Sequence, residues 1–118
     1  MQFVFDDGGR AAAGFNGKVN DCAVRAIAIA TGKPYGEVYA ELWRDDEPMF
    51  RFVFQPYLEN LGWRWTPTKT ALLRHLPGGR LIVEVRNHML AVIDGVIHDT
   101  KPRDETTYVP GYFTAAPV

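Results

Sequence analysis

Hydrophobic residues return at helical spacing close to the start of the chain. Between Asp21 and Thr31, apolar side chains recur every three or four positions and form one stripe with a second beside it: Cys22, Ala26 and Ile29, then Ala23, Ile27 and Ala30. Gly32 and Pro34 follow directly, as is typical of the end of a helix. We therefore predict a mostly buried helix over residues 21–31.

Two more helices are expected before residue 62. Pro34 suits the first turn of a helix that continues through Trp43. The segment MFRFVFQPYLENLG, residues 49–62, predicts a third, which Pro56 is expected to kink or restart. Ahead of all three, the short apolar run from Gln2 to Phe5 leads into a glycine-rich turn region.

The pattern changes after Gly62, where residues typical of β-strands take over. WRWTPT (63–68) alternates like a strand, and TALLRHLPGG (70–79) predicts a short helix ended by a turn. Three segments rich in β-formers follow: RLIVEV (80–85), NHMLAVI (87–93) and VIHDT (96–100). Helices first and strands afterwards indicate an α+β domain rather than a βαβ repeat.

Composition limits the size and the partners of the protein. With 118 residues and 47% apolar content, the chain can bury one core, so we expect a single domain spanning 1–118. A net charge of -1 and a pI near 6.3 argue against nucleic acid or an anionic membrane as a partner. The sequence shows no signal peptide and no apolar run near the roughly 18 residues of a membrane span. We expect a soluble, cytoplasmic monomer.

The single cysteine lies in a position that favours reactivity. It cannot form an internal disulfide, and Asn20 or Asp21 is a natural N-cap that would place Cys22 in the first turn of the predicted helix. The N–H groups and dipole of a helix start favour the thiolate, which is the nucleophilic form. A buried core thiol is the competing interpretation, because Cys22 shares its stripe with Ala26 and Ile29.

A predicted hairpin selects a partner for the thiol. Asp94-Gly95 is typical of a two-residue type I′ turn, which pairs Ala91 with His98 and Leu90 with Asp99. Because side chains alternate along a strand, His88 shares a face with Asp99 as its diagonal neighbour, whereas His98 points to the other face.

Nucleophilic catalysis needs a nucleophile, a base and an acid that orients the base. Periodicity therefore selects Cys22, His88 and Asp99 as candidate catalytic residues. The alternative is a solvated strand-end histidine with an aspartate that serves as a turn or cap residue.

The segments NDCAVRAIAIATGKPYGEVYAEL and NHMLAVIDGVIHDT resemble the small papain-like cysteine peptidases of the C39-like kind, including short versions encoded by bacteriophages. The resemblance implies a papain-like fold with N-terminal helices packed on a C-terminal antiparallel sheet. It also implies hydrolysis of a peptide or isopeptide bond through a thioester acyl-enzyme. Cys22 would be the nucleophile, His88 the general base and then acid, and Asp99 the residue that orients the imidazole.

The same resemblance implies an oxyanion hole. Papain-like enzymes place a glutamine six residues before the cysteine, and Asn16 occupies that position here with a shorter side chain. Asn20 is a competing donor, and both residues also fit a plain turn or cap. The backbone N–H of Cys22 would be the second donor.

Other residues carry weaker signals. Trp63 and Trp65 are candidates for a substrate groove, although alternating aromatics on a strand also fit a core and its rim. Arg25 is able to pair with an acid or a substrate carboxylate, or to extend into solvent. One cysteine and three dispersed histidines do not form a metal-ligand cluster, so we expect no metal and no cofactor.

Two rival functions remain open. An acyltransferase or transglutaminase-like amidase would use the same triad and pass the acyl group to an amine. A binding module would keep the fold and modulate a host protein. In the first interpretation, as for a peptidase, the partner is a peptide or protein substrate.

Overall fold

The computed structural model describes residues 1–15, 20–43 and 51–115. Within these ranges the chain forms three α-helices, one 3₁₀ turn and six strands. The helices are α1 (Cys22–Thr31), α2 (Tyr35–Leu42) and α3 (Arg51–Asn60), and the 3₁₀ turn is Leu73–His75. The strands are β1 (Gln2–Phe5), β2 (Trp63–Pro67), β3 (Arg80–Val85), β4 (His88–Ile93), β5 (Val96–Asp99) and β6 (Gly111–Ala115).

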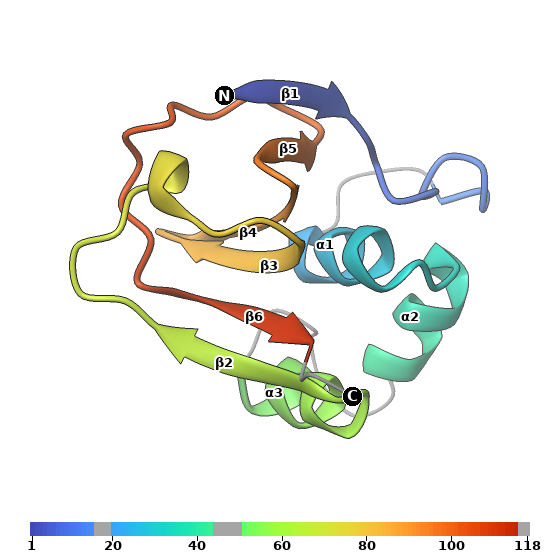
Figure 1. Ribbon diagram of the computed structural model, residues 1–118. Helices are drawn as coiled ribbons and strands as arrows, with labels where there is room; N and C mark the ends of the chain where they lie inside the picture. Colours follow the sequence, from blue (N-terminus) through green and yellow to red (C-terminus); the bar gives the residue numbers. More distant parts are fainter. Residues whose placement is uncertain (16–19, 44–50, 116–118) are drawn as a thin grey trace.

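The six strands form one mixed sheet in the order β1-β5-β4-β3-β6-β2 (Figure 1). The predicted α+β class is confirmed. The expected antiparallel C-terminal sheet is wrong in one respect, because the N-terminal β1 joins it in parallel beside β5. All other strand pairs are antiparallel.

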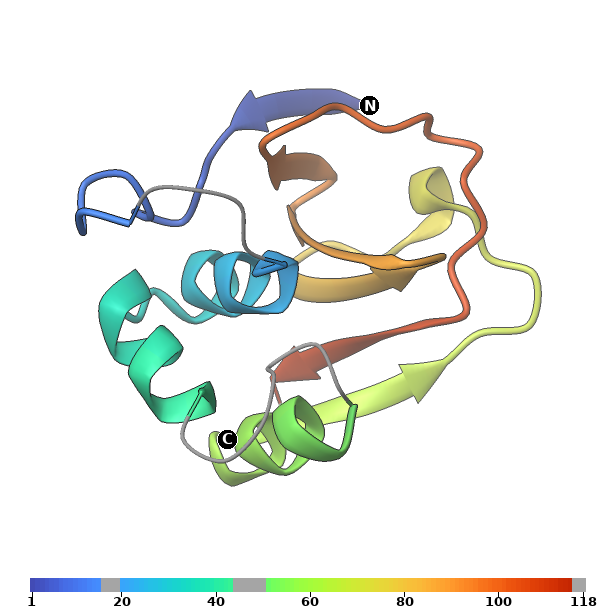
Figure 2. The ribbon, with the colours of Figure 1, turned by 180° about the vertical axis from the view of Figure 1, so that it is seen from behind.

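The helices pack on the sheet and on one another. α1 contacts β3, β4 and β5, α3 contacts β2, and α2 bridges α1 and α3 (Figures 1 and 2). The predicted end of α1 is confirmed, since Gly32 has a φ of 77° and its N–H donates to the Ala28 carbonyl at 2.9 Å. α3 runs through Pro56 without restarting, and the helix expected over 70–79 is a single 3₁₀ turn. None of the helices in the described ranges is long and apolar enough to cross a bilayer.

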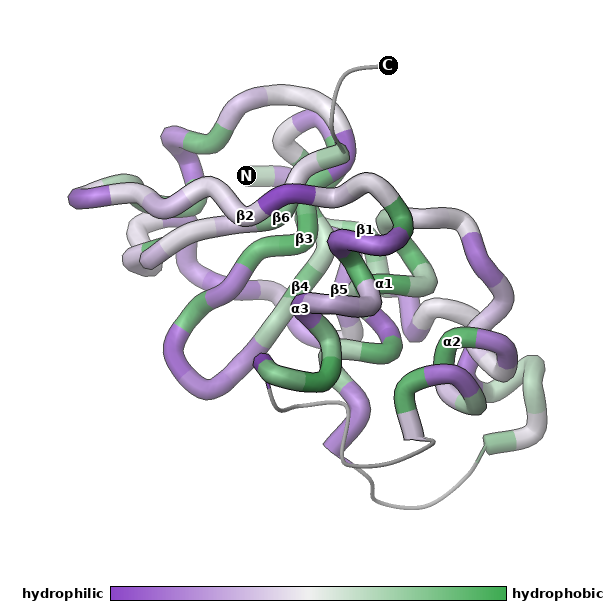
Figure 3. The backbone as a smooth tube through the Cα atoms, turned by 90° about the horizontal axis from the view of Figure 1, so that it is seen from below, coloured by the Kyte–Doolittle hydropathy of each residue, from purple (hydrophilic) through white to green (hydrophobic). Residues whose placement is uncertain are grey.

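Buried side chains lie on both faces of the sheet. One cluster joins the helices to the sheet and includes Ala26 and Ile27 of α1 with Ile82, Met89 and Ala91. The other covers the opposite face: Leu73, Leu81, Val83, Val85, Leu90, Val92, Ile97 and Val109. Figure 3 shows hydrophobic segments along α1 and β3 and alternating character along α2. α1 is therefore held on one side of β4, with its first residue close to the start of that strand.

The β4–β5 hairpin has the predicted register. Ala91 pairs with His98 and Ile93 with Val96. Asp94 and Gly95 have φ values of 48° and 79°, and a type I′ turn needs positive φ at both positions. This turn places Asp99 at the end of β5 that lies beside the start of β4.

Candidate active site

Cys22 is the first residue of α1 and is only 3% exposed. Asp21 occupies the predicted N-cap position, but its side chain makes no capping hydrogen bond to the first turn. The cysteine thus lies at the positive end of the helix dipole and inside the core at the same time.

His88 is the first residue of β4 and follows a two-residue turn. Val85 pairs with His88 across this turn, and Asn87 closes it with a left-handed φ of 59°, a conformation that asparagine tolerates well. Nε2 of His88 lies 2.7 Å from Oδ2 of Asp99, and the ring also forms a side-chain hydrogen bond with Cys22. Because Nε2 is hydrogen-bonded to the Asp99 carboxylate, Nδ1 is the ring nitrogen that remains to contact the Cys22 thiol. Cys22, His88 and Asp99 are therefore joined in series.

These contacts shift the protonation equilibria of His88 and Asp99. The hydrogen bonds with Asp99 and then with Cys22 raise the pKa of His88 to about 9, although burial opposes them. Burial raises the pKa of the Asp99 carboxyl, but the hydrogen bonds from His88 and Thr100 and the charge of Arg25 outweigh it. The pKa of Asp99 thus lies below its ordinary value. An imidazolium facing an ionised carboxylate is the favoured state near neutral pH.

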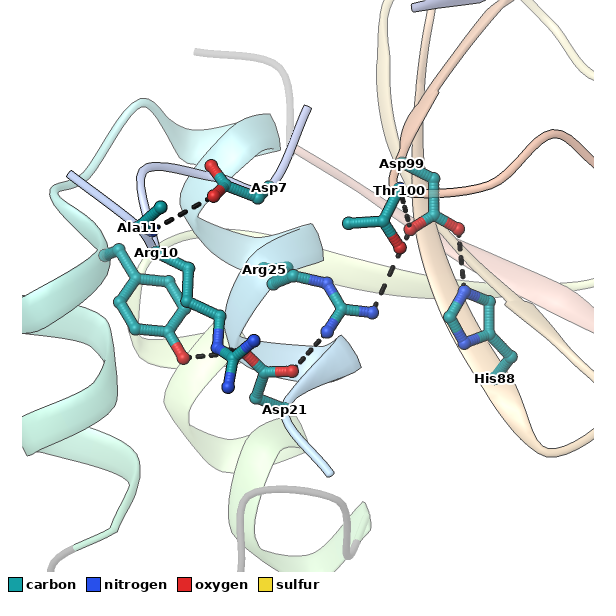
Figure 4. A network of polar contacts seen from close by, with 9 residues as sticks. Asp7, Arg10, Ala11, Asp21, Arg25, His88, Asp99 and Thr100 are labelled. Carbon is teal, nitrogen blue, oxygen red and sulfur yellow. Dashed lines mark hydrogen bonds and ion pairs between the residues drawn. The ribbon is translucent and has the colours of Figure 1, made fainter. Parts of the chain in front are cut away.

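Both oxygens of Asp99 have partners. Oδ2 binds His88, whereas Oδ1 accepts the Thr100 N–H at 2.7 Å and lies 4.0 Å from Nη2 of Arg25 (Figure 4). Arg25 comes from α1, so this contact joins the Cys22 helix to the strand that carries Asp99. The carboxylate is fixed from two sides.

A second buried carboxylate lies beside the cysteine. Asp21 is ion-paired with Arg25 and with Nε of Arg10 at 3.2 Å, and it accepts a hydrogen bond from the Tyr35 hydroxyl at 2.6 Å (Figure 4). Burial and the Asp21 carboxylate raise the pKa of Tyr35, which keeps its hydroxyl as a donor. Arg25 thus pairs with acids and does not extend into solvent. The sequence carried a signal for this pair, because Asp21 and Arg25 stand at i,i+4 spacing.

The other two histidines have different surroundings. Nδ1 of His75 accepts the Leu72 N–H at 3.3 Å within the 3₁₀ turn. Nδ1 of His98 lies 3.7 Å from a carboxylate oxygen of Asp6. The hairpin register therefore selected the histidine that meets Asp99.

A cavity of about 350 Å³ opens beside His88. Four polar residues besides His88 and three apolar residues line it: Asn20, Arg51, Glu84 and Asn87, with Phe54, Val85 and Met89. Cys22 is not among these lining residues, so the cavity meets the triad at the imidazole. Arg51 and Glu84 form an ion pair that the sequence did not indicate, because 33 positions separate them.

The remaining predicted site residues lie in three places. Asn16 falls outside the described residues, whereas Asn20 is exposed and lines the cavity beside His88. Trp63 is buried in the core, and Trp65 packs against Phe113 at a ring distance of 5.0 Å. Neither tryptophan lines the cavity at His88, and the two correspond to the core and rim of the alternative interpretation.

Comparison with protein-family models, with curated proteins and with solved structures gave no match to this chain.

Proposed function

We propose that the protein is a cysteine peptidase or amide hydrolase of papain-like design that acts on a peptide or isopeptide bond. The series of hydrogen bonds from Cys22 through His88 to Asp99 carries the proposal. A thiol at a helix start, an imidazole on a neighbouring strand and a carboxylate behind it match the roles of nucleophile, base and orienting acid. The α1 helix against β3, β4 and β5 supports the papain-like arrangement.

Acylation begins with the thiol proton on Nδ1 of His88. The Cys22 sulfur attacks the substrate carbonyl carbon, and the carbonyl π pair moves to oxygen. That oxygen takes hydrogen bonds from the Cys22 backbone N–H and from the Asn20 side chain, which lines the cavity beside His88. The intermediate then collapses, the C–N bond breaks, and the leaving amine takes the proton from Nδ1. A thioester remains on Cys22.

Hydrolysis reverses the proton path. A water molecule gives a proton to Nδ1 of His88 as its oxygen attacks the thioester carbonyl. Collapse breaks the C–S bond, releases the acid product and restores the thiolate facing the imidazolium. Asp99 keeps Nε2 of the ring occupied throughout, so the same ring nitrogen serves both steps.

The test is cleavage of a peptide library followed by mass spectrometry, with the Cys22→Ala protein as the control. New termini in the wild-type digest only, together with a mass increase on Cys22 in a rapid quench, are the expected result. Library cleavage that persists in Cys22→Ala would rule the mechanism out.

A binding module is the second candidate, and the burial of Cys22 favours it. A nucleophile must be reached by its substrate, whereas a side chain that is 3% exposed is typical of a core thiol. Under this interpretation the chain captures one host protein and leaves it uncleaved. An intact partner, recovered at equal yield by wild type and Cys22→Ala, is the outcome that it requires. Transfer of the acyl group to an amine is distinguished by adding an amine to the library and searching for its adducts.

A further inference from the structure

Two oppositely charged side chains line the cavity beside His88 and compensate each other's charge. Arg51, the first residue of α3, is ion-paired with Glu84 of β3. The two side chains are 39% and 31% exposed, so both remain accessible from the cavity.

The Arg51 guanidinium is held in place by more than this ion pair. Its Nη1 donates to Oε1 of Gln55 at 3.3 Å, and its Cζ lies 4.1 Å from the centre of the Trp65 ring. A guanidinium stacked on an aromatic ring and bonded at two nitrogens keeps one orientation. The charged wall is thus fixed before any ligand arrives.

Apart from His88, whose ring is paired with Asp99, the rest of the cavity is apolar or carries uncharged amides. Phe54, Val85 and Met89 are its buried lining residues, and Asn20 and Asn87 are exposed amides that also line it. A ligand with an apolar stem would contact the first group. A ligand end that both donates and accepts hydrogen bonds would match the second, together with the Glu84 oxygens and the Arg51 donors.

We propose that this cavity is the side-chain subsite of the enzyme and that it selects an uncharged, carboxamide-bearing residue of glutamine type. Glu84 would repel a substrate carboxylate and Arg51 would repel a substrate ammonium, and the opposite charge that could attract either one is already engaged in the Arg51–Glu84 ion pair. A carboxamide carries no charge, so neither residue repels it, and it can donate hydrogen bonds to Glu84 and accept them from Arg51. The role of the cavity in choosing substrates rests on the proposed function, because the cavity meets the triad at His88.

Because the two charges of the ion pair compensate each other, neutralising either one should change which substrate side chain the cavity prefers. Glu84→Gln leaves the Arg51 charge uncompensated and is expected to favour an acidic side chain. Arg51→Gln leaves Glu84 uncompensated and is expected to favour a basic one. Each change is expected to alter relative affinity about fivefold, the size typical of one partly exposed charge contact.

Binding is measured by NMR on the ¹⁵N-labelled full chain, with the acetyl N-methylamides of glutamine, glutamate and lysine as probes. The side-chain amide signals of Asn20 and Asn87 report occupancy of the cavity. In the wild type the glutamine probe should bind most tightly. In Glu84→Gln the affinity of the glutamate probe, relative to that of the glutamine probe, should rise about fivefold. In Arg51→Gln the relative affinity of the lysine probe should rise by the same factor. Glu59→Gln is the matched control, because it makes the same charge change on α3 at a residue that does not line this cavity.

Two results would overturn the subsite. One is a probe order in Glu84→Gln that equals the wild-type order, and the other is an absence of shifts at Asn20 and Asn87 with all three probes. Glu84→Gln retains the contacts of Arg51 with Gln55 and Trp65, so it serves as the test even where Arg51→Gln fails to fold. Because probe binding needs no turnover, a protein that shows the expected probe order without cleaving any peptide would contradict the proposed function and leave the subsite standing.

Discussion

Nη2 of Arg25 lies 4.0 Å from Oδ1 of Asp99, the carboxylate oxygen that does not bind His88. Arg25 is also paired with Asp21, whose next residue in the chain is Cys22. The contacts therefore run from Cys22 through His88, Asp99 and Arg25 and return to the start of α1. This ring of contacts ties the two strand ends to the helix that carries the thiol.

We expect Arg25→Gln to weaken catalysis by positioning, without any contact to the substrate. Loss of the guanidinium charge allows the pKa of Asp99 to rise, because that charge helps to keep it low. Turnover of a cleaved peptide should fall about tenfold, and the acid limb of its pH profile should move upward by up to about one pH unit. Arg25→Lys should restore part of both.

The control for this change is Arg10→Gln, which removes the other guanidinium paired with Asp21. A general loosening of the Asp21 network would affect both variants alike. An acid limb that shifts equally in Arg10→Gln would therefore contradict the positioning role of Arg25.

The three residues of the series should respond differently to substitution. Cys22→Ala and His88→Ala each remove a reacting group and should abolish turnover. Asp99→Asn keeps an oxygen that is able to accept from Nε2, so turnover should fall by up to about 10⁴-fold without being abolished. Initial rates on the cleaved peptide measure this, with circular dichroism to confirm that the variants fold. Full activity in Cys22→Ala would exclude it as the nucleophile.

The local parts of this site could be predicted from the sequence. The Asp94-Gly95 turn fixes the β4–β5 register, and that register alone brought His88 and Asp99 to one face. Gly32 marked the end of α1, and the N-cap candidates Asn20 and Asp21 placed Cys22 in its first turn. Each of these features depends on neighbours within a few residues, which is the range over which turn and cap preferences act.

The long-range parts could not be predicted in the same way. β6 inserts between β3 and β2, and β1 pairs with β5 in parallel. No short turn connects the strands of these pairs, so the sequence carries no local signal that predicts them. Alternation also places His88 with Leu90 and Val92, whose cluster lies on the sheet face away from α1. His88 contacts Cys22 from the first residue of β4. At the end of a strand, the alternation of side chains does not predict which residue of a neighbouring helix lies within reach.

The stability of the protein should depend on pH through His88. Its pKa in the folded protein is about 9, above the ordinary 6.5, so the pair with Asp99 contributes fully below about pH 6.5 and is lost as the pH rises through 9. We expect the free energy of unfolding to fall by roughly 1–2 kcal/mol over that interval, a value reduced for the solvent screening of a partly exposed pair. Urea titrations of wild type and His88→Ala measure it, and an equal decline in both would exclude His88 as its source.

Gly111 of β6 is expected to be intolerant of a side chain. A Cβ at this position would overlap the Trp65 ring and lie 2.9 Å from the Thr66 carbonyl oxygen. Gly111→Ala should therefore cost about 1–3 kcal/mol of unfolding free energy and displace the ring on which Arg51 stacks. Gly36→Ala in α2 is the matched control, since nothing lies within 4 Å of its added Cβ, and it should stabilise by about 0.5–1 kcal/mol. Equal effects at the two positions would show that the Trp65 contact is not the cause.

Alkylation of Cys22 separates a catalytic thiol from a core thiol. Iodoacetamide reacts with the thiolate, and an ordinary free cysteine forms it with a pKa of ~8.5. The imidazolium of His88 persists up to about pH 9 and faces the sulfur, so a catalytic pair should be alkylated rapidly near pH 6–7. Removal of that opposite charge in His88→Ala should slow the alkylation measured at pH 6.5.

Burial provides the opposing expectation, because a side chain that is 3% exposed is shielded from the reagent. The rate is therefore compared with that of the same chain unfolded in urea, in which access is complete and His88 is no longer held beside the sulfur. A folded protein that reacts faster than the unfolded chain at pH 6.5 has a thiolate stabilised by its fold, since burial alone slows the reaction. Slow labelling of the folded protein at that pH, unchanged in His88→Ala, would assign Cys22 to the core and leave the binding module as the better account of the fold.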